Sequence, residues 1–140
     1  MLFKLTTVIS ILAAASYVSA GINCEGSSLC SEGTGDVSRK LTGYINQLAD
    51  SRWVDNGVQI ACVREPHSGD SDGSICAFMQ NTGGAPASSL KQLAQDIVDH
   101  GCNKCGSVPL FYPTDNNDGD HGILTFNYVA QGCGKSGLCI

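Results

Sequence analysis

Eight cysteines in a chain of 140 residues are the strongest constraint on how this sequence can fold. All of them follow residues 1–20, where Lys4 precedes an apolar run and Val18-Ser19-Ala20 supplies small residues before an expected cleavage site. This pattern is typical of a secretory signal peptide, and its apolar run is too short to span a membrane. An even number of cysteines in an exported chain predicts disulfides. We therefore expect a secreted, extracellular protein with one disulfide-rich domain over residues 21–140.

The charge balance excludes one class of partner. Without Lys4, residues 21–140 contain 7 basic and 13 acidic side chains, a net charge of −6. Such a chain has no basic face with which to displace counterions from phosphates, so nucleic acid is not an expected partner. The hydrophobic content of 42% argues against disorder. We expect a monomer with a modest core.

Two disulfides are predicted from local spacing. Cys62 and Cys76 flank a polar loop, and in a hairpin they would face each other across neighbouring strands. Cys133 and Cys139 bracket a flexible Gly-Lys-Ser-Gly-Leu stretch that can close into a small ring.

Four cysteines then remain. Cys24 and Cys30 are left to pair with Cys102 and Cys105, in an order that the spacing does not decide. The Cys-x-x-Cys arrangement of the second pair also fits a redox motif, or half of a zinc site completed by the first pair. The redox interpretation lacks a βαβ context, and the zinc interpretation lacks a second close Cys-x-x-Cys, so we favour structural disulfides.

Apolar spacing predicts two helices. The first covers about residues 37–50, with Asp36 as its capping residue, and Trp53 follows it as an expected core residue.

The second helix opens at Pro86 and ends at Gly101 in a left-handed conformation. Ser89 and Gln92 have the spacing of a capping box, and His100 lies in the last turn, where a cation is favoured.

Three strands are predicted, over Val58–Arg64, Ser74–Asn81 and Ile123–Val129, whereas Ser107–Asp120 reads as a loop. Helices interleaved with strands predict an α+β fold. We expect a two-layer α/β-sandwich, with two helices on one face of a mainly antiparallel sheet.

No catalytic or metal-binding motif emerges from the sequence. His67, His100 and His121 lie far apart along the chain, and the acidic stretches 70–73 and 115–120 lack the twelve-residue calcium-loop pattern. We interpret these stretches as solvated turns. The sequence therefore predicts no enzyme, no cofactor and no metal.

Three blocks resemble a known family. Gly21–Cys30, which contains Cys-Glu-Gly-Ser-Ser-x-Cys, is similar to the mature amino terminus of the KP-four killer toxins. Val98–Leu110, which contains His-Gly-Cys-x-x-Cys-Gly-Ser, resembles that family's second-helix exit, and Leu124–Val129 resembles its last strand. The blocks occur in the family's order, and the resemblance covers most of residues 21–133.

The resemblance implies a fold and a function. Members are secreted, non-enzymatic α/β-sandwich toxins that inhibit competing fungi, and sometimes plant cells, by blocking calcium uptake at voltage-gated channels. Their proposed contact lysine lies near the cysteine that matches Cys62, but Ile60 occupies that position in this chain. We therefore take Arg64, the nearest basic residue, and Lys104 as candidate binding residues for a membrane target on the victim cell.

The acidic charge keeps a second function open. The family's best-known toxin is basic, whereas residues 21–140 of this chain carry −6. A secreted non-enzymatic effector or binding protein on the same scaffold is the alternative.

Overall fold

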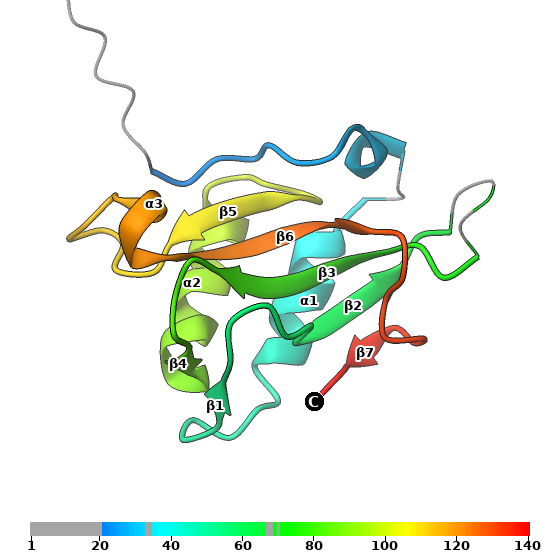
Figure 1. Ribbon diagram of the computed structural model, residues 1–140. Coiled ribbons are helices and arrows are strands. Elements are labelled where there is room, and N and C mark those ends of the chain that lie inside the picture. Colours follow the sequence, from blue (N-terminus) through cyan, green and yellow to red (C-terminus); the bar gives the residue numbers. More distant parts are fainter. Residues whose placement is uncertain (1–20, 33–34, 67–68, 70) are drawn as a thin grey trace, which may run out of the picture.

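Two helices pack on one face of an antiparallel sheet, as the sequence predicts (Figure 1). The computed structural model describes residues 21–32, 35–66, 69 and 71–140. The expected signal peptide at residues 1–20 lies outside the described residues. Among the described residues, no helix is long and apolar enough to cross a membrane.

The sheet has five strands in the order β5-β6-β3-β2-β7, and every neighbouring pair is antiparallel. The strands are β2 (Ala61–Arg64), β3 (Ser74–Gln80), β5 (Gly106–Pro109), β6 (Ile123–Val129) and β7 (Gly137–Leu138). The central pair, β3 and β6, is in register over seven residues, from Ser74 opposite Val129 to Gln80 opposite Ile123. A separate two-stranded sheet joins β1 (Trp53–Val54) to β4 (Ala85–Pro86).

The prediction that residues 107–120 form a loop is wrong. This segment contains most of β5 and the start of a short helix, α3 (Asp118–His121). A four-residue strand that starts with glycine and ends with proline shows no alternation that a sequence pattern could reveal. It forms because Val108 is fully buried and β6 provides a pairing edge.

The first helix, α1 (Val37–Ile45), ends earlier than the predicted residue 50. After Ile45 the hydrogen-bond spacing shortens from four residues to three. The main-chain N–H groups of Gln47 and Leu48 donate to the carbonyls three residues before them. This turn keeps the Leu48 side chain buried.

Asp36 does not cap α1 with its side chain. It adopts a left-handed conformation with φ 60° and makes no side-chain capping bond. The main-chain N–H of Ser38 instead donates to the carbonyl of Asn103 at 3.1 Å. The helix start is therefore satisfied by a segment 65 residues away, which no local motif can predict.

The capping box predicted at Ser89 and Gln92 is also wrong. The second helix, α2 (Ala87–Asp99), begins earlier, with Pro86 in the N-cap position. The first two N–H groups of α2 donate to main-chain carbonyls of the 50–52 turn, at 2.8 and 3.1 Å. At the other end the prediction is confirmed, since Gly101 has φ 99°.

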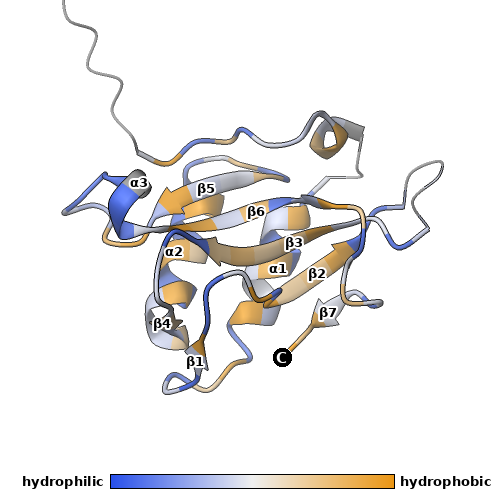
Figure 2. Ribbon diagram, in the orientation of Figure 1, coloured by the Kyte–Doolittle hydropathy of each residue, from blue (hydrophilic) through white to orange (hydrophobic). Residues whose placement is uncertain are grey.

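The core lies between the helices and the sheet, where apolar residues of both layers meet (Figure 2). Its largest fully buried side chains come from α1, α2 and the central strands: Leu41, Ile45, Leu90, Ile97, Ile75, Met79, Leu124 and Phe126. Burying each such side chain contributes about 1.5–3 kcal/mol.

The prediction that Trp53 belongs to the core is wrong, because its side chain is 57% exposed. In the short strand β1, the neighbouring Val54 is the buried residue, at 1% exposure. Neighbouring side chains of a strand point to opposite faces, so burial of one leaves the other outside.

Four disulfides connect the chain: Cys24–Cys102, Cys30–Cys105, Cys62–Cys76 and Cys133–Cys139. The first two bridge separations of 78 and 75 residues. The third joins register partners on β2 and β3, and the fourth closes a separation of 6 residues near the carboxyl end.

Removing a long-range disulfide should cost more stability than removing a short one. In the chain-entropy account, C24A/C102A loses about 4–5 kcal/mol and C133A/C139A about 2 kcal/mol, because the larger loop restricts the unfolded chain more. Denaturant unfolding of both double variants measures the difference. Equal losses would contradict this assignment of the stabilisation.

Candidate binding site

Two disulfides fasten the amino-terminal segment to the exit of α2. Cys24 and Cys30 flank the start of a 3₁₀ helix, η1 (Ser28–Glu32), and bond to Cys102 and Cys105. The structure thus gives one of the two orders that the spacing left open. The two Cys-x-x-Cys sulfurs bond to the amino-terminal segment and not to each other.

The same segment covers one edge of the sheet. Asn23 and Ser107 of β5 exchange two main-chain hydrogen bonds, at 3.1 and 2.9 Å, and their side chains are also bonded. In Figure 1 the segment runs alongside β5. At the other edge, β7 pairs with β2. Covering the β5 edge, and leaving a strand of only two residues at the other edge, limits the unpaired strand groups that would otherwise template aggregation.

Gly26 explains why the Cys-Glu-Gly motif contains a glycine. A Cβ atom there would lie 2.8 Å from the Cβ of Cys105, and 2.9 Å from both the Asn127 Oδ1 and the Cys30 Sγ. Asn127 Oδ1 also accepts a hydrogen bond from the main-chain N–H of Ser27 at 2.9 Å. The segment therefore packs on β6 without space for a side chain at this position.

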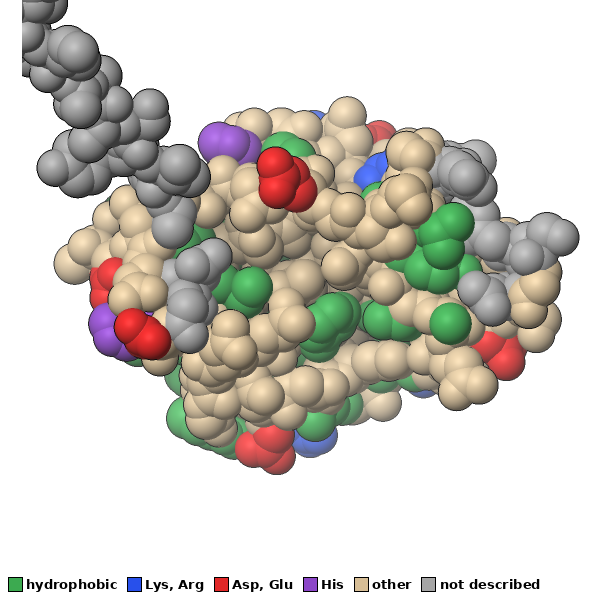
Figure 3. Space-filling view, turned by 45° about the horizontal axis from the view of Figure 1, so that its top comes forward, with side chains coloured by type: hydrophobic (Ala, Val, Ile, Leu, Met, Phe, Trp, Pro, Cys, Tyr) green, Lys and Arg blue, Asp and Glu red, His purple; other side chains and the backbone are tan. Residues whose placement is uncertain are grey.

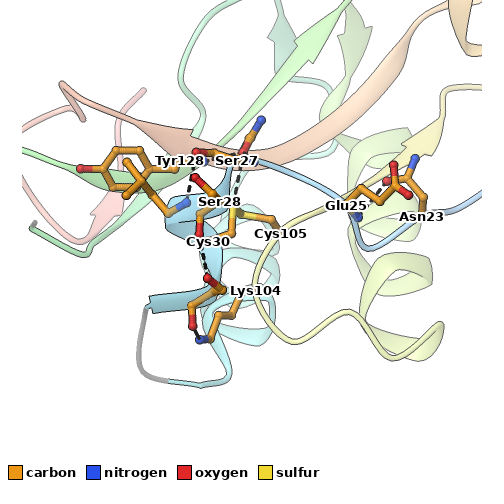
Figure 4. The surroundings of a disulfide bond; sticks show 11 residues. Asn23, Glu25, Ser27, Ser28, Cys30, Lys104, Cys105 and Tyr128 are labelled. Atoms are coloured by element: carbon orange, nitrogen blue, oxygen red, sulfur yellow. Dashed lines mark hydrogen bonds between the residues drawn. A yellow bond between two sulfur atoms is a disulfide. The ribbon is translucent and has the colours of Figure 1, made fainter.

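These elements enclose a shallow hollow of about 580 Å³, which we call the disulfide hollow. Its lining includes the four cysteines of the two long-range disulfides, together with Glu25, Asn103, Lys104 and serines of residues 27–31. Figure 4 shows part of this region around the Cys30–Cys105 bridge.

Lys104 is the cation of the disulfide hollow. Its side chain is half-buried, and its Nζ donates to the main-chain carbonyl of Ser31 at 2.8 Å (Figure 4). Among the described residues it forms no ion pair with a carboxylate. A carbonyl partner orients the ammonium group without neutralising its charge.

Arg64 lies elsewhere, at the end of β2, and braces the β2–β3 hairpin. Its guanidinium donates to the carbonyl of Ser71 at 2.7 Å and pairs with Asp72 at 3.6 Å. Its main-chain N–H donates to the Ser136 hydroxyl. The described contacts do not bring Arg64 and Lys104 together.

A third polar cluster, which the sequence analysis took for a solvated turn, lies at α3. His121 Nδ1 bonds the Asp115 carboxylate, and the Phe111 ring meets the His121 ring edge to face at 6.2 Å between centroids. The pKa of Asp115 is lowered, first by a hydrogen bond from the main-chain N–H of Asn117 and then by His121. The Asp-x-Asn turn was the only sequence signal for this arrangement.

Three sulfurs, those of Cys62, Cys133 and Cys139, also lie close together. All three belong to disulfides, so they are not the thiolates that a metal needs. They carry no metal site in this oxidised protein.

Comparison with known proteins decides the family. Residues 6–130 match the family model described as Kp4. Over 113 residues, the chain is 31% identical to the KP4 killer toxin of Ustilago maydis P4 virus, which covers 79% of this chain and 81% of that toxin. This chain belongs to the Kp4 killer toxin family.

Membership fits the site described above. The Kp4 killer toxin family is non-enzymatic, and the Asp115–His121 pair lies on an exposed turn and not in a deep catalytic pocket. In this Kp4 protein, the Cys-Glu-Gly motif builds the contact between the amino-terminal segment and β6.

The Gly26→Ala variant should unfold more easily than the parent protein. The added methyl group overpacks a disulfide-bounded contact, with an expected loss of about 1–3 kcal/mol. Gly35→Ala is the matched control, because a Cβ atom at Gly35 meets nothing within 4 Å. A stable Gly26→Ala protein in denaturant unfolding would show that the segment can shift at no cost.

Asp115 should make stability depend on pH. Because its pKa is lowered in the folded state, its contribution is complete above the ordinary value of about 3.9 and is lost as pH falls through the folded value. Asp115→Asn should therefore melt at a lower temperature than the parent at neutral pH, and the difference should shrink towards pH of about 2. Asp55→Asn, another exposed carboxylate, is the control. A difference independent of pH would contradict the role of the charge.

Proposed function

We propose that this Kp4-family protein is secreted and inhibits the growth of competing fungi or plant cells by reducing calcium uptake through voltage-gated channels. Family membership over most of the chain is the observation that carries the proposal. Export would remove residues 1–20, and residues 21–140 would act as a single extracellular domain. The disulfide-rich fold suits an oxidising, extracellular setting.

Within this proposal, Lys104 is the better of the two candidate contact residues. The two long-range disulfides fix the main chain on both sides of its hydrogen bond to Ser31, so little side-chain freedom remains to be lost on binding. Its partner is a neutral carbonyl, which leaves the positive charge available to an acidic channel surface.

Arg64 is the weaker candidate. Its charge is shared with Asp72, and its guanidinium holds the hairpin through Ser71. A target that used Arg64 would first have to compete with these contacts. Ile60, at the position of the family's contact lysine, is fully buried and offers no charge at all.

Replacing Lys104 should weaken the toxin without unfolding it. We expect Lys104→Gln to lose about tenfold in potency, equivalent to about 1.4 kcal/mol of binding free energy. Lys40→Gln, an exposed lysine of α1 without an ion pair among the described residues, should keep full potency. The measurements are calcium uptake and growth of sensitive fungi and plant roots exposed to the secreted, oxidised protein.

Two results would count against this proposal. Full potency of Lys104→Gln would remove Lys104 from the contact surface. Growth inhibition by the parent protein with unchanged calcium uptake would remove the channel as its target.

The acidic charge favours one alternative function. With 13 acidic against 7 basic side chains, residues 21–140 are repelled by the acidic surface that a cationic channel blocker would seek. A secreted non-enzymatic effector or binding protein on the same scaffold would instead be recovered with a soluble or wall partner, and membrane currents would not change.

A further inference from the structure

A shallow groove beside α3 shares no lining residue with the disulfide hollow. It measures about 650 Å³, and its lining includes Asn56, Asn81, Thr82, Gly84, Phe111 and His121. We call it the aromatic groove. Neither the family comparison nor the proposed toxin contact at Lys104 accounts for it.

One exposed aromatic side chain lines the groove, and a second lies outside it, against a residue of its lining. Phe111 lines the groove and is 56% exposed, although its ring is held edge to face against His121. Trp53, 57% exposed, packs against Gly84, where a Cβ atom would lie 2.7 Å from the indole Nε1. Aromatic side chains are enriched at binding surfaces, where they supply apolar contact area beside polar groups.

The turn between the two aromatic side chains is held in place from several sides. Asn56 Oδ1 accepts the main-chain N–H of Thr82 at 3.2 Å, and the Thr82 hydroxyl accepts the N–H of Gly84 at 3.3 Å. Gly122 packs so closely on the turn that a Cβ atom there would lie 2.6 Å from Thr82. The groove is therefore largely preformed, which reduces the entropy lost on binding.

The polar groups of the groove suit hydroxyl-rich ligands. Asn81 is held with φ 58°, and its side-chain amide makes no hydrogen bond to other described residues. An amide offers two donors and one acceptor oxygen, which match the donor and acceptor roles of a sugar hydroxyl. His121 uses Nδ1 for Asp115, so Nε2 is its remaining polar atom.

The charged side chains near the groove argue against a polyanion as its ligand. The lining of the groove includes the carboxylate of Asp120 and contains neither Lys nor Arg. Lys and Arg side chains are few on the face in Figure 3, which shows apolar side chains across its middle and separate acidic ones mostly towards its periphery. An anionic polymer would be repelled by Asp120 and by the net charge of −6 on residues 21–140.

From these observations we propose that the aromatic groove binds a neutral polysaccharide chain. The apolar C–H face of one sugar ring stacks on Phe111 in the groove, that of another stacks on Trp53 where the indole borders Gly84, and the hydroxyl groups bond the amide of Asn81. Such binding would hold the secreted protein on a cell wall, independently of any contact made by Lys104.

Sedimentation with insoluble polysaccharides tests the proposal. The secreted, oxidised protein should co-sediment with at least one of chitin, β-1,3-glucan or cellulose, should resist high salt, and should not bind polygalacturonate. Phe111→Ala and Trp53→Ala should each weaken the binding about tenfold. Asn81→Gly removes the amide, keeps the left-handed turn, and should also weaken it.

Matched controls separate binding from folding. Tyr44→Ala removes an aromatic side chain of α1, away from the groove, and should sediment like the parent protein. Thermal melting of each variant checks that the fold is retained. Lys104→Gln should bind the polysaccharide normally even where growth inhibition is lost, so that failure of one proposal is distinguishable from failure of the other.

Three outcomes would overturn the proposal. One is that the parent protein sediments with none of the neutral polysaccharides. Another is that folded Phe111→Ala and Trp53→Ala proteins bind as well as the parent. The third is aromatic-dependent sedimentation with zwitterionic phosphatidylcholine vesicles in place of polysaccharide, which would make the two aromatic side chains a membrane contact.

Discussion

The covalent connection of the amino-terminal segment to the exit of α2 is the constraint on which the rest of the structure depends. Cys24–Cys102 and Cys30–Cys105 join parts of the chain that are 78 and 75 residues apart. Asn23 then lies against β5, and Ser27, between the two amino-terminal cysteines, lies against β6, although this segment forms no long strand of its own. A chain of this size has a modest hydrophobic core. The disulfides therefore add to the stability that burial of apolar side chains provides.

The same cross-links explain how functional groups are presented. Lys104 lies between Cys102 and Cys105, so its ammonium group is placed by the main chain on both sides. The aromatic groove is built differently, from loops that pack through close contacts at Gly84 and Gly122. Both are shallow surface features, which is consistent with a non-enzymatic family.

Local patterns predicted the regular elements well where a strand or helix lies in the middle of the sandwich. β6 was predicted at both ends, because Leu124, Phe126 and Tyr128 alternate with polar residues along a strand with one buried face. Boundaries and caps were predicted poorly. The start of α1 uses the carbonyl of Asn103, and the start of α2 uses the 50–52 turn, so neither depends on its own neighbouring side chains.

Residue patterns alone determined the α+β class, the positions of the central strands, and the resemblance to killer toxins, because periodic burial and spaced cysteines are local properties. Only the tertiary structure decided the exposure of Trp53, the strand β5, the Asp115–His121 pair and the different surroundings of Arg64 and Lys104. The exposure of Trp53 and the strand β5 depend on which face of a short element packs inward and on a partner strand distant in the sequence. The Asp115–His121 and Arg64–Asp72 contacts are closer along the chain, but they depend on the conformation of a loop. Neither kind of contact leaves a periodic trace in the sequence.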